Sequence, residues 1–164
     1  MKKKTGILIA GAVVLVLLAA GLWYTRPVSL TELCPQMEDG TIREITGTFI
    51  AQEVRADGKV DSIPTSLVLE EDGPALAEVL EVLKEQRCRR RLLGLLPWAE
   101  GAGQTAMDSY DWYLMASGVS IFADERGLCI TMDGTDTVFC RAGDQTALVR
   151  EVYDILDRTW QENR

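Results

Sequence analysis

An uncharged apolar run near the N-terminus constrains this chain more than any other feature of its sequence. The run covers 18 residues from Gly6 to Trp23, and Lys2, Lys3 and Lys4 precede it. As a helix with a rise of 1.5 Å per residue it would reach about 27 Å, close to the roughly 30 Å hydrocarbon thickness of a bilayer. The sequence therefore predicts a transmembrane helix that holds the chain in a lipid bilayer.

The residues on either side of the run predict its orientation. The lysine cluster outweighs the lone Arg26 on the other side, and basic flanks stay in the cytoplasm. Trp23 and Tyr24 are of the aromatic type that favours the membrane interface. We expect residues 1–24 to be cytoplasmic lysines and anchor, residues 25–40 to be a tether, and residues 41–164 to be a domain outside the cytoplasm.

A cleaved signal peptide is the alternative interpretation of the same run. Ala20 offers a small residue for cleavage, but Leu18 is unsuitable two positions earlier. The run also exceeds the usual apolar length of a signal peptide, about 7 to 15 residues, so an uncleaved anchor is favoured. Cleavage would instead make the chain a secreted protein.

The charge balance predicts which partners the domain avoids. Three of the 17 basic residues precede the apolar run, so 14 basic residues face 25 acidic ones in the remainder, a net charge of −11. This charge would repel a phosphate backbone unless a local basic patch overrode it, so no nucleic-acid partner is expected. A basic or neutral protein or another cell-surface component fits better.

The pattern of apolar residues predicts an α+β domain. Residues 74 to about 87 and 145–160 have the apolar spacing of helices. Short β-branched or alternating runs predict strands at 42–54, 63–69, 109–115, 119–124, 128–132 and 137–141. Residues 89–107 are interpreted as a loop. The resulting order, β-β-α-β-β-β-β-α, favours a mainly antiparallel sheet with helices on one face.

Four cysteines in an extracytoplasmic domain raise the question of disulfides. If the turn near Gly134 is centred between residues 134 and 135, Cys129 and Cys140 face each other across a hairpin and a disulfide is within reach. Cys34 and Cys88 would then be the remaining pair. The alternative is that the cysteines stay free as small apolar residues.

Cys88 also invites a second hypothesis, because Arg87, Arg89, Arg90 and Arg91 surround it. A cationic neighbourhood lowers the pKa of a thiol and can make it reactive. Arginines that merely flank a helix end, where they offset the helix dipole, are the favoured explanation.

Most catalytic chemistries lack the residues that they require. The chain has no histidine, which excludes histidine-based catalysis and histidine-ligated zinc. The cysteines lack the paired spacing of a thiolate zinc site, and no glycine-rich loop carries the lysine of a phosphate-binding loop. No catalytic, cofactor or metal residue is therefore predicted.

These observations together predict a non-enzymatic, single-pass binding or interaction module of the bacterial cell envelope. An aromatic group close in sequence is the candidate binding face, because aromatic side chains give a large contact area at low entropic cost: Trp98, Tyr110, Trp112 and Tyr113. Two alternatives stay open. One is an enzyme with carboxylate chemistry around the residue 94–107 loop. The other is a structural spacer stapled by disulfides.

Overall fold

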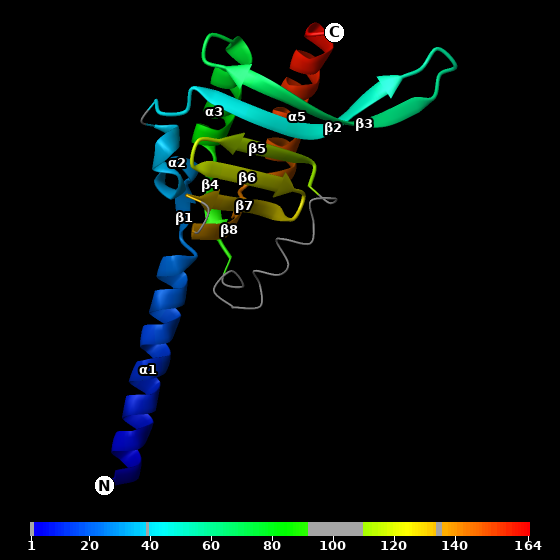
Figure 1. The fold of residues 1–164 in the computed structure, drawn as a ribbon. Coiled ribbons are helices and arrows are strands. Elements are labelled where there is room, and N and C mark those ends of the chain that lie inside the picture. Colours follow the sequence, from blue (N-terminus) through cyan, green and yellow to red (C-terminus); the bar gives the residue numbers. More distant parts are fainter. Residues whose placement is uncertain (1, 39, 92–109, 134–135) are drawn as a thin grey trace.

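The computed structural model describes residues 2–38, 40–91, 110–133 and 136–164, with residues 2–8, 10 and 136 described by their backbone alone. Its elements follow the chain from the N-terminal helix to the C-terminal one (Figure 1): α1 (Lys2–Tyr24), β1 (Pro27–Ser29), α2 (Leu30–Leu33), η1 (Pro35–Met37), β2 (Glu44–Val54), β3 (Val60–Glu70), α3 (Pro74–Glu85), β4 (Arg87–Arg90), β5 (Trp112–Ala116), β6 (Val119–Asp124), β7 (Gly127–Met132), β8 (Asp136–Ala142) and α5 (Gln145–Glu162).

The described strands form one antiparallel sheet of eight strands. Their order across the sheet is β1-β4-β8-β7-β6-β5-β2-β3, so the four consecutive strands β5 to β8 form a meander in its centre. The predicted α+β class and the antiparallel sheet are confirmed. The predicted strand at 119–124 matches β6 residue for residue.

Helices α3 and α5 pack against each other and cover one face of the sheet (Figure 1). Pro74 begins α3, where its fixed φ suits the first helical turn. Asp144 caps α5, since its Oδ1 accepts a hydrogen bond from the Ala147 N–H at 3.0 Å. Both helices bury apolar stripes at helical spacing: Leu76, Val79, Leu83, Leu148, Val152 and Leu156.

Strand alternation divides the sheet into two faces. One row of paired positions lies on the face that the helices cover: Gly47, Leu114, Ile121 and Ile130. The three larger side chains of this row belong to the hydrophobic core. Their chain neighbours point the other way and line a face that no described helix covers, here called the helix-free face. One row of paired positions on that face consists of Thr48, Tyr113, Phe122, Cys129 and Phe139.

The expected tether at residues 25–40 is wrong, because most of this segment is part of the domain. Two residues separate α1 from β1, and β1, α2 and η1 follow at once. The segment contributes five buried side chains to the core: Val28, Leu30, Leu33, Cys34 and Met37. Their burial explains the difference, since apolar residues without a sustained period can still pack when the surrounding sheet supplies their partners.

The predicted loop at residues 89–107 is also partly wrong. Residues 89 and 90 belong to β4, which joins β1 to β8 and is too short and too charged to be recognised as a strand from its sequence. Residues 92–107 lie outside the described residues.

Helix α1 projects away from the domain as a separate rod (Figure 1). The structure does not describe the side chains of four residues of the predicted anchor: Gly6, Ile7, Leu8 and Ala10. Within the described residues, no helix has both the length and the apolar character needed to cross a membrane.

Candidate functional site: an aromatic pocket beside the helix-free face

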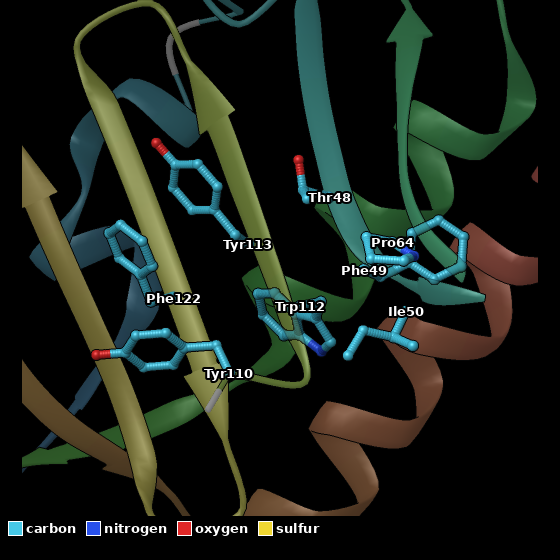
Figure 2. A pocket seen from close by; sticks show the side chains of 8 residues that line it. All are labelled: Thr48, Phe49, Ile50, Pro64, Tyr110, Trp112, Tyr113 and Phe122. Carbon is cyan, nitrogen blue, oxygen red and sulfur yellow. The ribbon is translucent and has the colours of Figure 1, made fainter. Parts of the chain in front are cut away.

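A pocket of about 340 Å³ opens at the junction of β2, β3, β5 and β6 (Figure 2). Small-molecule sites in proteins begin at about this volume. The lining is mostly aromatic and aliphatic: Thr48, Phe49, Ile50, Pro64, Tyr110, Trp112, Tyr113 and Phe122.

The pocket exists because β2 pairs with two strands over only part of its length. β2 pairs with β5 from Thr46 to Phe49, and Phe49 opposite Trp112 is the last pair of this ladder. Beyond that point β2 continues only with β3 and forms a projecting arm (Figure 1). The Tyr153 hydroxyl donates a hydrogen bond to the Ile50 carbonyl at 2.8 Å, which ties the base of the arm to α5. The pocket lies where the arm leaves the sheet.

Three rings make the aromatic wall of the pocket. Tyr113 and Phe122 are stacked, with ring centroids 4.2 Å apart and planes 13° apart. Tyr110 lies against the other side of the group, 5.0 Å from Phe122 and tilted by 44°. All three side chains are half-buried, so they are supported by the sheet and keep ring surface for a ligand.

Trp112 has a different role from its neighbours. It is 1% exposed, and its indole N–H donates a hydrogen bond to the Val149 carbonyl of α5 at 3.0 Å. The indole therefore anchors the pocket floor to the helical layer and offers little surface of its own.

The structure brings together three of the four predicted face residues, because Tyr110, Trp112 and Tyr113 all line this pocket. Trp98 lies outside the described residues. Sequence reasoning missed Phe122, although its place in an alternating strand next to buried Ile121 and Ala123 marks it as a residue of the opposite face.

Carboxylates lie near one end of the aromatic wall. Burial raises the pKa of Tyr110, and the charges of Cys129 and Asp124 add to the rise. Burial also raises the pKa of Asp111, with further contributions from Glu125 and Asp124. Asp124 is fixed by the β6–β7 turn, since its Oδ1 accepts hydrogen bonds from the Arg126 and Gly127 N–H groups at 2.7 and 2.9 Å. Negative charge beside aromatic faces suits a cationic group.

The predicted Cys129–Cys140 alignment is wrong by one residue. Cys129 pairs with Phe139, and Cys140 pairs with Leu128. The last pair of the ladder is Met132 opposite Asp136, so the turn has three residues. A turn centred between residues 134 and 135 would need an even number. Asp133, the first residue of the turn, has a φ of 49°. A slip of one residue reverses the side-chain faces, so Cys129 and Cys140 point to opposite sides of the sheet.

The thiol beside Cys140 belongs to Cys88. β4 pairs with β8 so that Cys88 faces Ala142 and Arg90 faces Cys140, which puts both cysteines on the helix-covered face. The neighbouring Cys140 thiol lowers the pKa of Cys88, and Cys88 together with burial raises the pKa of Cys140. Both side chains are fully buried, so Cys88 is not the accessible reactive thiol of the alternative hypothesis.

The other two cysteines have separate surroundings. The Cys34 thiol donates to Gln36 Oε1 at 3.5 Å, and burial raises its pKa. Burial also raises the pKa of Cys129, which is held on the other face of the sheet. All four cysteines are free and buried in the structure, and the expected pairing of Cys34 with Cys88 is not formed.

No cluster of three or more cysteine or carboxylate side chains able to hold a metal ion occurs in the described ranges of the chain. Comparison with protein-family models, with curated proteins and with solved structures finds no match to this chain.

Proposed function

We propose that this chain is a non-enzymatic binding module of the bacterial cell envelope, anchored by α1 and facing away from the cytoplasm. Its binding surface is the aromatic pocket, and its partner is a protein segment that inserts a lysine or arginine side chain. The observation that carries the binding proposal is the aromatic wall, in which Tyr113 stacks on Phe122 and Tyr110 is tilted against Phe122, with Asp124 close to Tyr110.

The exposure of α1 supports the anchor. Val13 to Leu18 are six consecutive apolar residues, each more than half exposed. Successive helical residues point about 100° apart, so six of them surround the helix completely. A helix that is apolar on all sides needs an apolar environment on all sides, whereas a helix packed on a domain is apolar on one face. Trp23 at its end is 68% exposed, as suits a ring at the membrane interface.

The chemistry of the pocket supports a cationic guest. An ammonium or guanidinium group within about 6 Å of an aromatic face is attracted by the ring quadrupole. Asp124 contributes to the raised pKa of Tyr110, and Glu125 and Asp124 contribute to the raised pKa of Asp111. These carboxylates therefore lie near the pocket and add attraction for a cation. The net charge of −11 on the rest of the chain steers a basic partner towards the domain.

Defined peptides test the binding proposal. We would measure the fluorescence anisotropy of labelled peptides with full-length protein in neutral detergent micelles, comparing a lysine-containing peptide with its glutamate counterpart. Binding of the lysine peptide alone is expected, and the Tyr113→Ala and Phe122→Ala variants should weaken it by about tenfold or more, as expected of aromatic anchors. Thr46→Ala and Thr131→Ala are matched controls on the same face outside the pocket. Equal binding by both peptides, or by all variants, would refute the proposal.

Protease accessibility tests the anchoring and its direction. A protease added to intact cells should remove the domain and leave the N-terminal lysines inside the cell. Recovery of the full-length chain in the fraction released by an alkaline wash would contradict the anchor. A mature chain lacking about the first 20 residues would show the cleaved form instead.

A further inference from the structure

Four arginines gather on the helix-free face at the end of the sheet opposite the aromatic pocket. Arg87, Arg89 and Arg91 alternate along β4 and its continuation, and Arg89 pairs with Arg141 of β8, so all four point to the same side. We call them the arginine patch. All four are exposed, and within the described residues none of them forms an ion pair with a carboxylate.

The arginine patch lies at the root of the anchor. Pro27 of β1 is the register partner of Arg89, and Pro27 is three residues past the end of α1. Three residues span at most about 10 Å, and paired strands are about 5 Å apart. Arg89 is therefore within about 15 Å of the end of the helix, and Figure 1 shows β1 and β4 at the part of the sheet nearest α1. Long arginine side chains bring this distance into the range of the lipid headgroups.

Two more arginines contact the aromatic end of α1 itself. The Arg26 guanidinium lies 4.3 Å from the Trp23 ring centre and pairs with Glu32 at 2.9 Å. The Arg90 guanidinium lies 5.6 Å from the Tyr24 ring centre, and its buried Nε has no hydrogen-bond partner among the described residues. These contacts place further arginines at the junction of the sheet and α1, with Arg90 on the helix-covered face.

This concentration of positive charge is a local exception in a strongly acidic domain. The chain after the anchor has a net charge of −11, yet the arginine patch has four exposed arginines and no described counter-ion. Guanidinium groups bind phosphate oxygens through paired hydrogen bonds, and they bind them well at an interface. Anionic headgroups are the phosphate source that the anchored chain always has within reach.

We propose that the arginine patch binds the headgroups of anionic phospholipids and holds the β1–β4–β8 end of the sheet against the membrane. This inference rests on the proposed anchoring by α1. The aromatic pocket lies towards the opposite end of the sheet, on β2, β3, β5 and β6, and so outside the proposed headgroup contact.

Arginine labelling of the full-length protein tests the inference site by site. We would reconstitute the protein in vesicles of phosphatidylcholine alone and in vesicles that also contain phosphatidylglycerol, then label with phenylglyoxal. Labelling rates would be read by mass spectrometry after digestion with a protease that does not cut at arginine. Phosphatidylglycerol should slow labelling of Arg87, Arg89 and Arg141 by about fivefold, the equivalent of about 1 kcal/mol per arginine near an anionic surface. Salt at about 1 M, where the Debye length is about 3 Å, should remove the protection.

Distant arginines provide the controls. Arg43, Arg55 and Arg150 lie outside the arginine patch and should label equally in both vesicles. A variant with Arg87→Gln, Arg89→Gln and Arg141→Gln should retain less phosphatidylglycerol on extraction than one with Arg43→Gln, Arg55→Gln and Arg150→Gln, which has the same net charge.

Two outcomes would overturn the lipid assignment. One is equal labelling of the arginine patch in both vesicles, and the other is protection by a DNA oligonucleotide in neutral vesicles without protection by phosphatidylglycerol. Flotation of the protein with the neutral vesicles reports on the anchor separately, so loss of anchoring and loss of headgroup binding are distinguishable.

Discussion

Cys88 of β4 and Cys140 of β8 lie on adjacent antiparallel strands, where both side chains are buried on the helix-covered face and each shifts the pKa of the other. Cys129, the partner that the sequence suggested for Cys140, occupies the other face of the sheet. The pairing of strands that are distant in sequence therefore decides which two thiols are neighbours.

Both thiols are inaccessible in the closed fold, so we expect oxidation to join Cys88 to Cys140 when the core opens transiently, in denaturant below the unfolding transition. Treatment with a small-molecule disulfide such as oxidised glutathione would form one S–S bond, and the two electrons and two protons lost by the thiols would reduce the reagent to two thiols. Peptide mapping would show both cysteines disappearing together. Because a tryptic peptide from Gly127 to Arg141 contains Cys129 as well, fragment ions must locate the bond within it.

Single variants provide the control for this oxidation. In Cys129→Ser the bond should still form, whereas in Cys140→Ser the Cys88 thiol should stay free. A bond between Cys88 and Cys129 in the wild-type protein would contradict the register of the sheet.

Gly47 is required because β2 approaches α5 closely. A Cβ atom at this position would lie 2.7 Å from Cδ2 of Leu156, which is itself fully buried. Gly47→Ala should therefore lower the free energy of unfolding by roughly 1–3 kcal/mol, measured by chemical denaturation. Gly143→Ala is the control, since its nearest atom would be the Arg87 carbonyl oxygen at 4.0 Å. If Leu156→Val does not reduce the cost of Gly47→Ala, the steric explanation fails.

Trp112 should matter for stability more than for ligand contact. Trp112→Phe removes the hydrogen bond to Val149 and part of a buried ring, so we expect a loss of about 2 kcal/mol in the free energy of unfolding. Trp160→Phe, at a half-buried position on α5, should cost less. An equal loss in both variants would show that the hydrogen bond to the pocket floor is unimportant.

Asp111 should make stability depend on pH. Its pKa is raised by burial and by Glu125 and Asp124, so the folded state holds this proton more tightly than the unfolded chain, whose reference pKa is 3.8. Binding of this proton contributes to the free energy of unfolding. The contribution is fully present below pH 3.8 and is lost as the pH rises through the raised pKa of the folded state. Asp111→Asn should therefore stabilise the protein at neutral pH and have little effect in acid.

Chemical denaturation of Asp111→Asn and of the wild-type protein, each at neutral pH and in acid, tests this expected stabilisation. Asp154→Asn removes the same charge from the domain but also removes the partner of Arg150, 3.8 Å away, so it should give no stabilisation. Stabilisation by Asp154→Asn as large as that by Asp111→Asn would point to net charge instead of the local surroundings.

Much of the sheet could be predicted because its strands follow local rules. β6 alternates buried and half-buried residues, and the turn residues around it mark its ends. β1 and β4 escaped prediction because each is short and is ordered by its partners: Val28 pairs with Cys88, and Arg89 pairs with both Pro27 and Arg141. Such strands have no period of their own that a sequence could display.

The sequence alone determined the apolar N-terminal run, the α+β class, the acidic charge and the absence of histidine, because composition and local periodicity are properties of neighbouring residues. Only the tertiary structure decided which residues meet across the sheet. It made Cys88 and Cys140 neighbours, added Phe122 to the group of Tyr110 and Tyr113, and placed Arg141 beside Arg89 near the end of α1. Strand order and register produce these contacts, and a shift of one residue in register would have reversed the face of every side chain involved.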